Sequence, residues 1–126
     1  MFGKLSAGVA LLVLSAAPSF ADSSSCVEPY PPAQVDGVKA TQQQMKDAIQ
    51  DFKTFQSASD DYQQCLVTDL HEQEKEAAKQ KDPKPLDPSI AAGVNAKIDA
   101  NQRMKEKIGG ELNASIQAYK SAHPGG

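Results

Sequence analysis

The sequence predicts an all-α fold, in which a long antiparallel, coiled-coil-like helical hairpin carries an extended proline-rich N-terminal arm tied back by a disulfide. Three observations favour this fold. Two long segments repeat apolar residues at steps of three and four, a short proline-rich segment separates them, and the chain has two cysteines, Cys26 and Cys65. Helices joined by a short loop pack antiparallel.

The first 21 residues have the pattern of a secretory signal peptide. Lys4 gives a positive start, residues 5–17 form an apolar run, and residues 18–21 end in small side chains suited to cleavage. An uncleaved anchor is the alternative, but the apolar run is short for a bilayer and no stop-transfer pattern follows it. We therefore expect cleavage after Ala21, no transmembrane segment in the mature chain, and a periplasmic or secreted location, where disulfides persist.

The mature chain is mildly acidic and has little material for a core. Removing Lys4 with the leader changes the formal charge from −3 to −4. Nucleic-acid phosphates and anionic lipids favour a basic stripe, which this sequence lacks, so we expect no nucleic-acid partner. The chain has no tryptophan and only 6% aromatic residues, which predicts a thin core.

Residues 22–40 are expected to form the arm. Pro29, Pro31 and Pro32 fix their own φ and move the preceding residues out of the helical region, which predicts a polyproline-like conformation. The Asp-Gly pair at residues 36–37 marks a turn. A disordered N-terminus is the alternative, and the cysteine in this segment favours an ordered arm.

The first helix is predicted over residues 41–82, a stretch without proline or glycine. Thr41 and Gln44 form a capping box at its start. At full length it would have up to about 42 residues and span roughly 60 Å. The positions along its apolar face are Met45, Ala48, Ile49, Phe52, Phe55, Ser59, Tyr62, Leu66 and Leu70.

The second helix is predicted over residues 88–122, beginning at the last of three closely spaced prolines and ending before a tail at residues 123–126. Asp87 is its expected N-cap and Pro88 its first residue. The positions along its inner face are Ile90, Val94, Ile98, Asn101, Met104, Ile108, Leu112, Ile116 and Tyr119.

A loop centred near Pro85 predicts the register of the hairpin. The facing pairs would then be Ala77–Val94, Val67–Met104, Tyr62–Gly109, Ser59–Leu112, Phe55–Ile116 and Phe52–Tyr119. Two adjacent glycines, Gly109 and Gly110, cost roughly 2 kcal/mol in a helix interior relative to alanine. Close approach of an aromatic ring or a kink would explain them, and both alternatives remain open.

A disulfide between Cys26 and Cys65 is geometrically feasible. Cys65 lies 24 residues beyond Thr41, about 36 Å along the helix, whereas the 15 residues before Thr41 span about 46 Å when extended. The arm can run back along the first helix, and closing this loop stabilises the fold by roughly 4 kcal/mol. The side chains expected to cover the helix are Val27, Tyr30, Pro31, Pro32 and Val35.

Other roles for the cysteines fit the sequence less well. No Cys-x-x-Cys pair indicates redox activity or zinc binding, and no Cys-x-x-Cys-His pattern indicates haem attachment. Residues 23–25, all serine, lack the leucine that a bacterial lipid-anchor motif carries before its cysteine.

One part of the chain resembles a known group. Cys26-x-x-Pro29, the Pro31-Pro32 pair, Asp36-Gly37-x-x-Ala40-Thr41, Met45 and Tyr62-x-x-Cys65-Leu66 are the residues that carry the resemblance. They are similar to small exported hypothetical proteins of Gram-negative bacteria, with a Cys/Pro-rich N-terminal arm and a Tyr-x-x-Cys-Leu helix. The resemblance covers about residues 26 to 66 and implies a recurring exported fold without implying any chemistry.

No catalytic, cofactor or metal site is expected. His71 and Glu74 lie three residues apart and could share a divalent ion, but position 75 is lysine where a zinc-protease pattern has a second histidine. A solvated, charged helix face is the simpler interpretation. Asp60 and Asp61 are adjacent, so they diverge on a helix and make a poor acid–base pair.

These observations predict an exported, non-enzymatic helical protein with an interaction or structural role in the periplasm. The alternative is a small periplasmic chaperone or stress-protective protein that holds unfolded clients on apolar surface. Because a two-helix stripe leaves apolar area uncovered, we expect a protein partner or self-association in either case.

Overall fold

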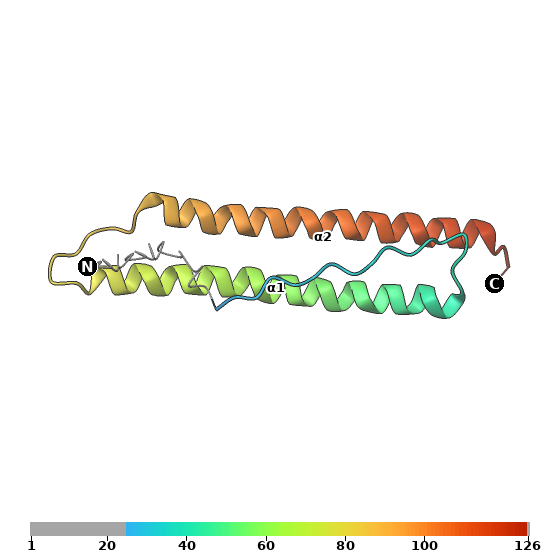
Figure 1. Cartoon of the computed structure of the whole chain (residues 1–126), viewed down its shortest axis with the longest axis horizontal. Helices are drawn as coiled ribbons and strands as arrows, with labels where there is room; N and C mark the ends of the chain where they lie inside the picture. The colour runs from blue at the N-terminus through green and yellow to red at the C-terminus, as the bar shows by residue number, and fades with distance from the viewer. Residues whose placement is uncertain (1–24, 126) are drawn as a thin grey trace, which may run out of the picture.

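The structure, a computed structural model that describes residues 25–125, is a two-helix hairpin with an arm along it (Figure 1). Helix α1 (Gln42–Ala78) packs antiparallel against helix α2 (Pro88–Ala122). The predicted all-α fold is confirmed, and no strand occurs in the part of the chain that the structure describes. The signal peptide expected at residues 1–21 lies outside the described residues.

Local interactions at residues 41–44 fix the start of α1. The Thr41 hydroxyl accepts a hydrogen bond from the Gln44 backbone N–H at 3.1 Å, and the Gln44 side chain accepts one from the Thr41 N–H at 2.8 Å. This reciprocal arrangement is the predicted capping box. It satisfies two backbone donors that have no partner within the helix.

Helix α1 ends at Ala78, four residues before the predicted end at 82. Lys79 is its C-cap. Pro83 explains the earlier end, because a proline ring clashes with the carbonyl four residues before it and disfavours helical geometry in the residue directly before it. Helix α2 begins as predicted at Pro88, where the Asp87 carboxylate accepts a hydrogen bond from the Ser89 N–H at 2.9 Å.

Burial divides the hairpin into two halves. We call residues 40–66 with 101–122 the base half and residues 67–100 the tip half. The buried apolar residues all lie in the base half: Ala40, Met45, Phe55, Tyr62 and Leu66. Two buried polar residues, Ser59 and Asn101, join them there, whereas no residue of the tip half is buried. The core is therefore short as well as thin.

The predicted register is wrong. Gly109 lies against the ring of Phe52, ten positions earlier in α1 than the expected Tyr62, a difference of roughly 15 Å along the axis. Asn101 likewise meets Ser59 and Gln63. The early end of α1 moves the loop centre toward lower residue numbers and accounts for part of the difference. The hydrogen bonds of Asn101 fix the stagger that is observed.

Candidate functional site

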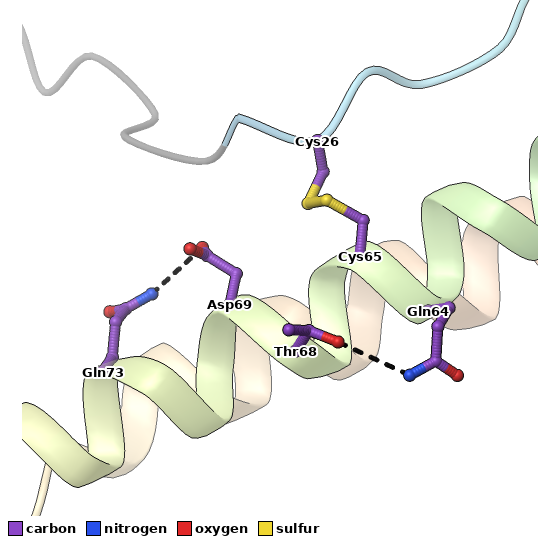
Figure 2. The surroundings of a disulfide bond; sticks show 6 residues. All are labelled: Cys26, Gln64, Cys65, Thr68, Asp69 and Gln73. Atoms are coloured by element: carbon purple, nitrogen blue, oxygen red, sulfur yellow. Dashed lines mark hydrogen bonds between the residues drawn. A yellow bond between two sulfur atoms is a disulfide. The ribbon is translucent and has the colours of Figure 1, made fainter.

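The disulfide joins the N-terminal end of the arm to the middle of α1 (Figure 2). Cys26 and Cys65 are 39 residues apart in sequence, and their Cα atoms lie 5.7 Å apart. The predicted bridge is confirmed. Beyond it along α1, Asp69 and Gln73 bond to one another at 3.3 Å, within the helix (Figure 2). Leu66, the last buried residue of α1, is adjacent to Cys65, so the core ends where the arm is attached.

The arm contacts the helices through every third residue. Cys26, Pro29, Pro32 and Val35 are half-buried, and every other residue from 27 to 36 is exposed. Three residues per turn is the repeat of a polyproline II helix, so one face of the arm lies on the hairpin and two face away. The predicted extended arm is confirmed, but its period-three contact face was not part of the prediction.

Three of the five side chains expected to cover the first helix point into solvent instead. Val27 is 82% exposed and Tyr30 is 95% exposed. Both follow a contact residue by one position, and one residue turns a polyproline II helix by about a third of a revolution. Their exposure therefore follows from the repeat of the arm. Pro31 is also exposed, whereas Pro32 and Val35 face the hairpin as expected.

The C-terminal end of the arm rests on α2. The Ser115 hydroxyl donates a hydrogen bond to the Val35 carbonyl at 2.6 Å. A Cβ on Gly37 would lie 1.9 Å from the backbone carbonyl oxygen of Ser115, so only glycine fits this contact. The arm therefore bridges both helices, from Cys65 of α1 to Ser115 of α2, rather than following the first helix alone (Figure 1).

A small cavity lies beneath the arm. It has a volume of about 20 Å³, and its lining includes Phe52, Ile108 and Leu112 from the helices and Pro32 from the arm. Glu111 also lines it, and the Glu111 Oε2 atom is buried without a hydrogen-bond partner among the described residues. A cavity of this size accommodates about one water molecule and excludes a substrate or an organic cofactor.

A polar layer crosses the core of the base half. The Asn101 amide donates to the Ser59 hydroxyl at 3.3 Å and accepts from the Gln63 amide at 2.8 Å. Gln63 also donates to Gln102 at 3.3 Å. Ser59 and Asn101 are 0% and 2% exposed. A buried asparagine in a helical seam penalises other registers, because slipping leaves its amide without partners. This layer contributes specificity rather than chemistry.

Gly109 packs against an aromatic ring, which is one of the two explanations that the sequence left open for the glycine pair. A Cβ at this position would lie 3.1 Å from Cζ of Phe52. A Cβ on Gly110 would have no neighbouring atom within 4 Å, and α2 continues through both glycines to Ala122. Close packing against a ring therefore accounts for Gly109, with Phe52 in place of the expected Tyr62.

Two acidic residues near His71, Glu72 and Glu76, form ion pairs along α1. Lys75 bonds to Glu72 at 2.8 Å and Lys79 bonds to Glu76 at 2.9 Å, all on an exposed face. The hydrogen bond from Lys75 lowers the pKa of Glu72, and the same contact raises the pKa of Lys75. Within residues 25–125, no three His, Cys, Asp or Glu side chains are grouped so that they could hold a metal ion.

A wide, shallow trough runs beside the arm at its C-terminal end. Its volume is about 470 Å³, and its walls include Ala33 of the arm. Three carboxylates, those of Asp36, Asp47 and Asp51, line it together with one ammonium group, that of Lys39. The trough is therefore acidic and open to solvent, and it is continuous with the exposed side of the arm.

No described helix has the length and apolar character needed to cross a membrane. The described surface thus offers a disulfide-held arm with one side exposed and an acidic trough beside it. Comparison with known proteins finds no matching family model, curated protein or solved structure.

Proposed function

We propose that this chain is an exported, non-enzymatic interaction protein of the periplasm, which binds a protein partner through the exposed side of its arm. One observation carries the proposal. Val27 and Tyr30 are the two most exposed large apolar side chains among the described residues, and both stand on a segment held at its two ends. Exposed aromatic side chains on a rigid support are the usual energetic centres of protein interfaces.

A non-enzymatic role is supported by the groups that the fold brings together. The enclosed space beneath the arm holds about one water molecule, and two of the acidic residues near His71, Glu72 and Glu76, are exposed and paired with lysines. An interface needs only exposed surface of the right shape and chemistry, which the arm provides.

Export is the second element of the proposal. Two features suit a periplasmic or secreted protein. These are the basic and apolar start of the sequence, which resembles a signal peptide, and the disulfide. Intact mass of the protein recovered from the periplasm tests this element. We expect a chain that starts at Asp22 and in which alkylation before reduction labels neither cysteine. A full-length chain, or one with two alkylated cysteines, would contradict export with cleavage after Ala21.

The second candidate is a small periplasmic chaperone. The tip half favours it, because no residue between 67 and 100 is buried and its apolar seam is only half-covered. A holdase, however, needs broad adaptable apolar surface. The exposed large apolar side chains of the described chain are limited to Val27, Tyr30, Val38 and Met104. This distribution suits a defined contact better than capture of many clients.

One experiment separates the two candidates. Purified mature protein is added at equimolar ratio to several unrelated aggregating clients, and the same protein is used as bait in an envelope pull-down. An interaction protein leaves aggregation unchanged and retains one defined partner. Suppressed aggregation of several clients would instead establish the chaperone, and light scattering on the same sample shows whether the partner is a second copy.

A further inference from the structure

We infer that the exposed ridge of the arm docks into a groove lined by aromatic side chains and flanked by lysine or arginine on a partner protein. The inference rests on the proposed function and specifies the chemistry of the partner. We define the ridge as Val27, Tyr30 and Ala33, exposed residues that each follow a half-buried contact residue by one position. Two independent features, the shape of the ridge and the charge beside it, point to the same partner.

The ridge is preformed. The disulfide fixes one end of the arm, and the Ser115 hydroxyl together with the close contact of Gly37 fixes the other. A polyproline II segment has no internal hydrogen bonds, so a free peptide of this kind samples many conformations before binding. Here the fold has already ordered the segment, which reduces the conformational entropy lost on association.

Tyr30 is the most exposed large apolar side chain among the described residues, and Pro31 follows it directly. Both are exposed, and Tyr30 at 95% exposure presents its ring and hydroxyl to solvent. Extended proline-containing segments are recognised in grooves between aromatic side chains, where the flat faces of proline and tyrosine stack. Met104 adds apolar surface from α2, since it is exposed and lies one turn before the arm-facing Ile108 on the same side of that helix.

The charge beside the ridge selects basic flanking groups. Ala33 belongs to the ridge and also lines the acidic trough, so the ridge leads directly to Asp36, Asp47 and Asp51. One lysine, Lys39, offsets only part of their charge. A partner whose groove carried acidic flanks would be repelled, whereas lysine or arginine would gain both attraction and hydrogen bonds.

The same charges disfavour two other occupants. In a symmetric dimer formed ridge to ridge, the facing surface would be the same ridge and acidic trough, which supply neither an aromatic groove nor an excess of basic groups. An anionic membrane surface would likewise meet carboxylates instead of lysines. A separate protein with the stated groove is the occupant that fits both the ridge and the trough.

Site-specific photocrosslinking in the periplasm tests the inference on the oxidised, mature protein. Benzoylphenylalanine replaces Val27 or Tyr30 in the ridge and, as a control, Gln80 in the exposed loop at the hairpin tip. We expect both ridge positions, and not position 80, to crosslink one protein. Mass spectrometry should place the crosslinks in a segment of that protein that bears aromatic residues next to lysine or arginine.

Affinity measurements with the purified crosslinked protein then quantify the ridge. Tyr30→Ser should weaken binding about thirtyfold, the effect of losing an interface centre of about 2 kcal/mol. Val27→Ser should weaken binding as well, whereas Val38→Ser, at an exposed valine outside the ridge, should leave it unchanged. Asp47→Asn with Asp51→Asn should reduce affinity most at low salt.

Several results would overturn the inference. These are crosslinks from the ridge to a second copy or to lipid, a crosslinked segment without aromatic residues, or a change of less than twofold for Tyr30→Ser. If the ridge captures a defined protein whose crosslinked segment lacks aromatic residues, the inference fails and the proposed function stands, whereas capture by position 80 alone overturns both. If no position captures a defined protein, both fail.

Discussion

The base half and the tip half of the hairpin are built from the same two helices, yet only the base half has a buried core. Phe55 and Leu66 are buried in the base half, whereas Leu70 and Val94 of the tip half are half-buried in a similar apolar seam. The difference is the arm, which packs on α1 and α2 only as far as Cys65 (Figure 1). Two helices alone cover a narrow seam, and a third packed segment is needed to exclude water from it.

The largest expected effect comes from equivalent truncations in the two halves. Phe55→Ala should lower the free energy of unfolding by about 3–5 kcal/mol, because it leaves a cavity in the packed core. Leu70→Ala should cost about 1–2 kcal/mol, since a half-buried side chain loses less contact on truncation. Urea denaturation followed by circular dichroism measures both. Equal losses would show that the two halves are packed alike.

Glycine substitutions sharpen the comparison between the arm contact and open helix surface. Gly37→Ala should destabilise the fold by about 2–3 kcal/mol, because its Cβ would overlap the backbone of α2 and displace the arm. Gly110→Ala is the control and should stabilise by about 1 kcal/mol, since nothing lies near its Cβ and alanine favours a helix. If Gly37→Ala were neutral in thermal melts, the arm would not depend on this contact.

The smallest effect is expected at the start of α2, in the tip half. The backbone N–H of Ser89 donates to Asp87 and lowers the pKa of that carboxylate below its ordinary value of 3.8. The contribution of this cap to the free energy of unfolding is therefore present above pH 3.8 and is lost as pH falls through the lower pKa of the folded state. NMR titration of the Ser89 amide should give a midpoint below 3.8. A midpoint at or above 3.8 would contradict the capping role.

Local patterns in the sequence were enough to predict the helices and the disulfide. The capping box at Thr41, the cap at Asp87 and the apolar steps of three and four depend only on neighbouring residues. The reach of the arm follows from chain geometry, so the bridge between Cys26 and Cys65 could be predicted as well.

The register and the orientation of the arm depend on contacts between distant residues, so the predicted register is wrong and three of the five arm side chains expected on the first helix face solvent. The partners of Asn101 and the early stop imposed by Pro83 decide the stagger of the helices, and apolar spacing reports neither. The contact between Gly37 and Ser115 is likewise visible only in three dimensions.

The candidate site had a signal in the sequence that the prediction did not use. Cys26, Pro29, Pro32 and Val35 repeat every three residues, which matches the turn of polyproline II and places the residues between them outward. Applied to the arm, this repeat predicts exposure of Tyr30. The acidic trough has no such signal, because its carboxylates come from two separate segments of the chain.

Hydrogen exchange of the oxidised protein and of the Cys26→Ser/Cys65→Ser variant tests most directly the claim that the arm creates the core of the base half. The bridge stabilises the fold by roughly 4 kcal/mol. Without it, the protection factors of base-half amides should fall by on the order of several hundredfold. Amides of the tip half should already exchange faster and change little. Equal protection in both halves of the oxidised protein, or a base half unaffected by loss of the bridge, would contradict the claim.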